Sequence, residues 1–147
     1  MLKLRKNKKG FTLVELIVVI AIMAVLAGTV AGVTVSQLNK QTDKTMATEA
    51  KGIADFISTW IIENNIELAD GMTTLASVKE TADSTDNLST ALTKQYKDKF
   101  EEGEGKKGQK LGVKVASKTI TVNYIGKTDK GSATYTINAE GIVTKTK

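Results

Sequence analysis

Cysteine, histidine and proline are all absent from this chain of 147 residues. Without cysteine, neither a disulfide framework nor a thiolate metal site is available. Without histidine, the chain lacks the commonest general base and a common metal ligand. Triad hydrolases and zinc or non-haem iron enzymes are therefore poor candidates. We expect a protein that is not an enzyme, with no cofactor, no catalytic residue and no resident metal.

Positive charge is concentrated at the start of the chain. The net charge is +5, from 21 basic and 16 acidic side chains. The excess comes from five residues: Lys3, Arg5, Lys6, Lys8 and Lys9. Subtracting these five from 21 leaves a chain that begins at Phe11 with 16 basic and 16 acidic side chains. Such a neutral subunit can pack against its own copies without accumulating repulsion, and broad binding to nucleic acid is not expected.

An apolar run follows, from Phe11 to Val35. As a helix that rises about 1.5 Å per residue it measures roughly 37 Å, enough to cross a hydrocarbon core about 30 Å thick. The basic cluster before the run predicts a single span that leaves residues 1–10 in the cytoplasm and the carboxyl-terminal domain outside.

Glu15 is the only formal charge between Lys9 and Lys40. In a monomer it lies near the interface, where its cost is below the roughly 2.5–3.5 kcal/mol of a mid-bilayer acid. In a dry bundle of such helices it would require a cation. A secretory signal cleaved after Val25-Leu26-Ala27 and a permanent single-span anchor are the alternatives, but both accommodate Glu15 poorly.

The sequence Gly10-Phe11-Thr12-Leu13-Val14-Glu15, with basic residues before it and the apolar run after it, resembles the opening of type IV pilins and pseudopilins. The resemblance implies that a prepilin peptidase cleaves between Gly10 and Phe11, that Phe11 is then N-methylated, and that the subunits polymerise through this helix. It also implies that the new amino group of Phe11 pairs with Glu15 of a neighbouring subunit. An amine with a reference pKa of about 8 is mostly protonated at neutral pH, which suits that pairing.

The resemblance also implies partners: the peptidase and methyltransferase, an assembly platform with its ATPase, membrane lipid before assembly, and copies of the same chain. The leader itself has a physical role in this scheme. Each of its basic residues contributes on the order of 1 kcal/mol beside an anionic leaflet. Cleavage is therefore expected to loosen the hold of the membrane on the subunit.

Gly28-Thr29-Val30-Ala31-Gly32 is a GxxxG pattern within the apolar run. It is consistent with close helix packing in lipid, with mere composition, or with flexibility, because each glycine costs a helix roughly 1 kcal/mol relative to alanine. Many members of the family that the chain resembles carry a proline near this position. This chain has none, so the role of Gly28 and Gly32 stays open between packing and flexibility.

Beyond the run, apolar residues at spacings of three and four predict an amphipathic continuation of the helix to about Asn65: Met46, Ala50, Ile53, Ala54, Ile57, Trp60 and Ile61. We expect Phe56 and Trp60 to pack in the core. The predicted organisation is a leader at 1–10, an assembly helix at 11–35 and an extracellular domain at 36–147. This domain comprises a helix at 36–65, a connecting region at 66–110 and a sheet at 111–147.

The connecting region contains a turn at Asp70-Gly71, a short helix within 74–81, and a second helix marked by Leu88, Leu92, Tyr96 and Phe100, with Asp86 as its cap.

Residues 101–108 form a polar loop that contains a literal GxGxxG. A dinucleotide fingerprint follows a strand and opens a helix, whereas this one follows a helix and precedes a strand. Its three glutamates are compatible with calcium binding or with a solvated loop.

From Leu111 the apolar period changes to two, which predicts an antiparallel meander with a turn at Ser117-Lys118. The amphipathic helix can cover one face of that sheet, so the fold class is α+β and pilin-like. Five lysines lie near the first strand, at Lys106, Lys107, Lys110, Lys114 and Lys118. They suit protection of a sheet edge better than contact with DNA, because no aromatic platforms are interleaved with them.

We therefore predict the structural subunit of a type IV pilus, a surface filament for adhesion, motility or biofilm formation. The precursor is expected in the cytoplasmic membrane and the mature subunit in the extracellular filament. A pseudopilin of a type II secretion or competence DNA-uptake machine is the first alternative. An extracellular binding domain that stays anchored is the second.

Overall fold

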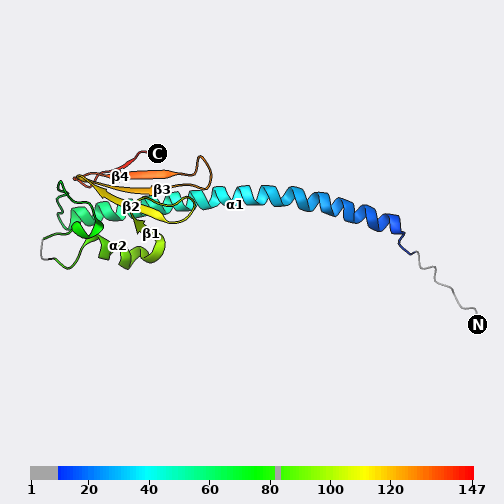
Figure 1. Ribbon diagram of the computed structural model, residues 1–147, viewed down its shortest axis with the longest axis horizontal. Coiled ribbons are helices and arrows are strands. Elements are labelled where there is room, and N and C mark those ends of the chain that lie inside the picture. The colour runs from blue at the N-terminus through cyan, green and yellow to red at the C-terminus, as the bar shows by residue number, and fades with distance from the viewer. Residues whose placement is uncertain (1–9, 82–83) are drawn as a thin grey trace, which may run out of the picture. The chain divides into compact units, whose positions relative to one another are not determined.

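Helix α1 (Leu13–Glu63) dominates the computed structural model, which describes residues 10–81 and 84–147 (Figure 1). It ends two residues before the predicted limit, because Asn65 adopts a left-handed φ of 48°. The backbone N–H groups of Asn65 and Ile66 then donate to the carbonyls of Ile62 and Ile61, which is a Schellman motif. The chain divides into two compact units, one ending at Leu38 and the other Asn39–Lys147.

The second unit is built on a five-stranded sheet with the order β1-β2-β3-β4-β5. The strands are β1 (Phe100–Glu102), β2 (Leu111–Ala116), β3 (Thr119–Tyr124), β4 (Ala133–Ile137) and β5 (Val143–Lys145). β2 to β5 pair antiparallel in sequential order, as the predicted meander requires. The fold class is thus confirmed.

Strand β1 departs from the prediction. It pairs parallel with β2, with Phe100 opposite Leu111, and it lies in the segment that was predicted to connect the helix to the sheet. A strand of three residues is too short to show a two-residue period, so the pattern gave no signal for it.

The core lies between the sheet and the second half of α1. Along β3 the side chains of Ile120, Val122 and Tyr124 are buried, and the residues between them are half-buried. The helix contributes its predicted stripe to the same apolar cluster: Ala50, Ile53, Ala54, Ile57 and Ile61. The two periodicities of the sequence therefore meet in one core.

The turn between β2 and β3 confirms the prediction at Ser117-Lys118. Both residues have positive φ, 33° and 61°, and Ala116 pairs with Thr119 across the turn. Two consecutive left-handed residues give the twist that a two-residue hairpin needs. The Thr119 hydroxyl donates to the carbonyl of Ala116 at 2.7 Å.

The connecting region contains two short 3₁₀ turns, η1 (Leu75–Ser77) and η2 (Lys97–Lys99), and helix α2 (Leu88–Tyr96). The prediction of Asp86 as the cap of α2 was wrong. The side chain of Asn87 caps the helix by accepting from Thr90 N at 3.0 Å. Asp86 is one residue too early in the chain and instead pairs with Lys94 at 3.7 Å.

Helix α2 also stops earlier than the spacing of its apolar residues predicted. Lys97 adopts a left-handed φ of 44°, which breaks the helix before Phe100. Phe100 therefore lies in β1 rather than on the apolar face of α2. The Tyr96 hydroxyl ties α2 to α1 by donating to the carbonyl of Gly52 at 3.0 Å.

Candidate functional site: the amino-terminal segment

The predicted cleavage site lies outside helical structure. Gly10, Phe11 and Thr12 precede the first helical residue, and all three are exposed. The Phe11 side chain is 87% exposed, and an added Cβ at Gly10 would meet nothing within 4 Å. The Gly10-Phe11 bond thus has the accessible, non-helical setting that a peptidase requires, and its cleavage stays a prediction.

Glu15 forms a capping box with Thr12 at the start of α1. Its Oε2 atom accepts from Thr12 N at 2.8 Å and from the Thr12 hydroxyl at 2.9 Å. In return Glu15 N donates to the Thr12 hydroxyl oxygen at 3.3 Å. The spacing Thr12-x-x-Glu15 is the sequence signature of this motif, so the cap was readable from the sequence and was missed.

The capping box uses only one oxygen of the Glu15 carboxylate. Among the described residues no donor reaches Oε1. Each carboxylate oxygen can accept more than one hydrogen bond. Glu15 is therefore able to cap its own helix and to accept an incoming cation at the same time.

The first unit has no buried residue between Gly10 and Leu38. Every residue from Gly10 to Leu38 is exposed, although α1 contains an 18-residue window here with a mean hydropathy of 2.8. One helix is therefore long and apolar enough to cross a membrane. Apolar side chains on all faces of a helix require lipid or other helices as neighbours.

Helix α1 continues unbroken through Gly28 and Gly32. An added Cβ at either glycine would meet nothing within 4 Å. The hydroxyls of Thr29 and Thr34 bond back to carbonyls of the preceding turn, Leu26 O at 2.9 Å and Val30 O at 2.8 Å. The glycine face is open for close approach of another helix, and its use stays a prediction.

A second carboxylate on α1, Asp43, was not singled out from the sequence. It is only 3% exposed and accepts four hydrogen bonds from β3 and the loop that follows it. The donors are the hydroxyl of Tyr124 at 2.8 Å, the backbone N–H groups of Lys127 at 2.8 Å and Thr128 at 2.9 Å, and the hydroxyl of Thr128 at 2.6 Å. Asp43 therefore fastens the β3–β4 loop to α1.

These contacts set the protonation of both partners. Burial by itself raises the pKa of Asp43, but the hydrogen bonds from Thr128, Lys127 and Tyr124 outweigh it and lower the pKa from 3.8 to about 2. Burial, reinforced by the hydrogen bond to Asp43, raises the pKa of Tyr124 from 10.0 to about 12. At neutral pH the carboxylate is thus charged and the phenol remains its donor.

One signal in the sequence points to Asp43. It lies on the apolar stripe of α1, four residues before Ala47 and seven before Ala50, so helical periodicity alone places it toward the core. A carboxylate at such a position is stable only with several donors. Helical periodicity does not indicate which residues supply those donors.

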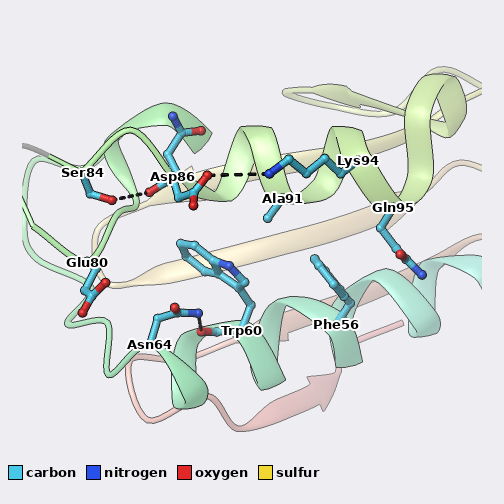
Figure 2. Close-up of a pocket in the computed structure, with 10 residues that line it drawn as sticks. Phe56, Trp60, Asn64, Glu80, Ser84, Asp86, Ala91, Lys94 and Gln95 are labelled. Atoms are coloured by element: carbon cyan, nitrogen blue, oxygen red, sulfur yellow. Dashed lines mark hydrogen bonds and ion pairs between the residues drawn. The ribbon is translucent and has the colours of Figure 1, made fainter.

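A groove of about 370 Å³ lies beside Phe56 and Trp60, and Figure 2 shows the residues that line it. Both rings are half-buried and pack against the core, and Phe56 meets Tyr96 edge to face at 5.7 Å. The prediction that these aromatics pack in the core is thus confirmed, although both side chains remain half-buried. Several polar groups of the groove already have partners in the fold: Asn64 bonds to Trp60 O and Asp86 pairs with Lys94.

The glutamates of the 101–108 segment have separate partners. Glu101 pairs with Lys106 at 3.4 Å, Glu102 accepts from Leu75 N at 2.7 Å, and Glu104 pairs with Lys114 at 3.8 Å. Within residues 10–81 and 84–147, no group of three or more acidic side chains is placed to hold a metal ion.

The lysines near β2 are partly neutralised. Lys106 and Lys114 pair with the glutamates just named, and Lys118 pairs with Asp70 at 3.3 Å. A strip whose charges alternate with acids attracts a polyanion weakly. This arrangement does not favour contact with DNA, but β2 is not the edge strand that the prediction assumed, because it pairs with β1 on one side and with β3 on the other.

Comparison with known proteins bears on the amino-terminal segment. No curated protein and no solved structure matches the chain. Residues 5–31 match the prokaryotic N-terminal methylation motif, a range that holds the predicted cleavage site, Glu15 and Gly28. Residues 5–31 thus carry the methylation signal that type IV pilins and pseudopilins share.

Proposed function

We propose that this protein is the structural subunit of a type IV pilus. In this proposal a prepilin peptidase cleaves after Gly10, Phe11 is methylated on its new amino group, and the subunits polymerise through α1. The carrying observation is the methylation motif on a helix whose apolar side chains are exposed from Phe11 to Leu38. Once the helix has left the lipid, copies of the same helix must cover that surface, which a filament of packed α1 helices would do.

The electrostatics of Glu15 support the same scheme. Its Oε2 atom accepts two hydrogen bonds from Thr12, whereas its Oε1 atom has no donor among the described residues. In a dry bundle a bare carboxylate is costly, and a protonated amine offsets that cost. We infer that the amino group of Phe11 in one subunit approaches Glu15 of the next and sets the axial register between them.

In this proposal the protein changes location during its maturation and has no catalytic role. The precursor lies in the cytoplasmic membrane with its leader inside, and the mature subunit lies in an extracellular filament with a role in adhesion, motility or biofilm formation. The protein is proposed to be no enzyme, consistent with a sequence that lacks histidine and cysteine.

The mass of the amino terminus tests the proposal. Protein sheared from the cell surface should begin at Phe11 and carry an additional methyl group on its α-nitrogen. A surface protein that still carries Lys9 and Gly10 would instead identify a permanently anchored domain and overturn the proposal.

A pseudopilin of a type II secretion or DNA-uptake machine shares the same motif and the same mature terminus. Electron microscopy of cells separates the two. Long surface filaments composed of this chain alone support the pilin, whereas short assemblies confined to the envelope support the pseudopilin.

A further inference from the structure

Four lysines surround a groove in the second unit. The groove has a volume of about 590 Å³. Lys40 and Lys44 reach it from α1, Lys130 from the β3–β4 loop and Lys145 from β5. The contacts of Asp43 with that loop hold the loop against α1. We call this feature the basic groove.

The four lysines of the basic groove are exposed. Within the described part of the chain, none of the four forms an ion pair, whereas six other lysines do: Lys51, Lys94, Lys99, Lys106, Lys114 and Lys118. Two acids line the groove, Asp129 and Asp43. The four hydrogen bonds to Asp43 come from neutral groups and do not cancel its charge. Four lysines and two acids give the lining a formal charge of +2, since 4 − 2 = 2, so the groove is suited to an anion.

The place of Lys40 in the chain indicates the source of that anion. Lys40 follows Val35, the end of the apolar run, by five residues, or about 8 Å along a helix. The headgroup layer of a bilayer extends roughly 5–8 Å beyond the hydrocarbon core. If Val35 marks the end of the span, Lys40 lies at the level of the phosphates.

We propose that the basic groove binds the phosphate of an anionic phospholipid in the leaflet opposite the leader. This inference rests on the proposed membrane-inserted precursor. The bound lipid would hold the second unit at the membrane surface until the subunit is extracted into a filament.

Hydrogen exchange measured by mass spectrometry on the full chain in lipid nanodiscs tests the inference. One set of nanodiscs contains phosphatidylcholine alone and the other also contains phosphatidylglycerol. We expect amides of residues 40–47 and 128–133 to exchange about tenfold more slowly when anionic lipid is at roughly ten times its dissociation constant. Inorganic phosphate added to phosphatidylcholine nanodiscs should give no protection.

Two variants with the same change in charge separate the groove from general electrostatics. The groove variant is Lys40→Gln, Lys44→Gln, Lys130→Gln and Lys145→Gln. The control is Lys97→Gln, Lys107→Gln, Lys110→Gln and Lys127→Gln, four exposed lysines outside the groove and outside every ion pair named above. The groove variant should lose the protection and the control should keep it. Two double variants, Lys40→Gln with Lys44→Gln and Lys130→Gln with Lys145→Gln, should each lose part of it.

Several results overturn the inference: equal exchange in both nanodiscs, equal loss in the control variant, or protection by free phosphate. Protection that arises only in filaments, without lipid, assigns the groove to acidic side chains of a neighbouring subunit and also overturns it. A chain that does not insert into either nanodisc refutes the proposed precursor as well, which distinguishes the two failures.

Discussion

The two units of this chain use apolar residues in opposite ways. From Gly10 to Leu38 every side chain is exposed, in spite of a mean hydropathy of 2.8 over an 18-residue window. In the Asn39–Lys147 unit the apolar residues of α1, α2 and the sheet form one buried cluster. The second unit thus buries its apolar side chains within one chain, whereas those of the first require lipid or further copies as neighbours. Helix α1 contributes residues to both units.

Two carboxylates of α1, one in each unit, differ in where their hydrogen-bond donors come from. Glu15 is held by Thr12, three residues away. Asp43 is held by Tyr124, Lys127 and Thr128, more than 80 residues away. The first leaves an oxygen open to another molecule, and the second is enclosed by its own fold. We expect Glu15 to govern assembly and Asp43 to govern stability.

The largest expected effect follows from Glu15→Gln. Glutamine preserves the capping box with Thr12 but removes the charge that the proposed pairing with Phe11 requires. Filament yield, measured by shearing and electron microscopy, should fall to near zero while membrane insertion and cleavage continue. Glu15→Val should likewise lose assembly.

Thr12→Ala is the matched control for Glu15. It removes the cap, at a cost of about 1 kcal/mol to the start of the helix, but keeps the carboxylate. This variant should still form filaments. Wild-type filament yield from Glu15→Gln, or loss of filaments from Thr12→Ala alone, would show that capping and not charge matters.

Asp43→Ala should cause the next largest change. It leaves the Tyr124 hydroxyl and three donors of the β3–β4 loop without their acceptor, so the free energy of unfolding should fall by about 3 kcal/mol or more. Urea unfolding of the detergent-solubilised chain, followed by the fluorescence of Trp60, measures this. Asp55→Ala removes only an exposed pair with Lys51 and should change stability little. Equal effects from the two variants would contradict the role of Asp43.

The contribution of Asp43 to the unfolding free energy should depend on pH in the acid range. Because the folded pKa is lowered from 3.8 to about 2, the stabilisation is fully present above pH 3.8 and is lost as the pH falls through about 2. The difference in unfolding free energy between the wild type and Asp43→Asn should therefore shrink across this window. A difference that stays constant from pH 5 to pH 2 would rule out a charged Asp43 in the native state.

Tyr124→Phe should have the smallest effect of the series. It removes one of the four donors to Asp43 and retains the buried ring, so we expect a loss of about 1 kcal/mol in unfolding free energy. Tyr135→Phe, at a buried position of β4, is the comparison. In a double-mutant cycle Tyr124→Phe should cost less in the Asp43→Ala background, and strictly additive losses would argue against the coupling.

Much of the amino-terminal site could be predicted from the sequence because its determinants are local. The apolar run, the isolated acid at Glu15 and the pair Gly10-Phe11 lie within residues 10–35. The helix in this segment can be predicted from its local composition. The capping box was equally local and was overlooked. What Glu15 meets in an assembly involves a second molecule, which one chain does not contain.

In the second unit the sequence determined what depends on period and turn chemistry: the stripe on α1, the meander and the Ser117-Lys118 hairpin. Only the tertiary structure decided the parallel pairing of β1, the donors of Asp43 and the convergence of four lysines on one groove. These features join residues that are distant along the chain. Hydrophobic periodicity records which face of an element is buried, but not which distant group it meets there.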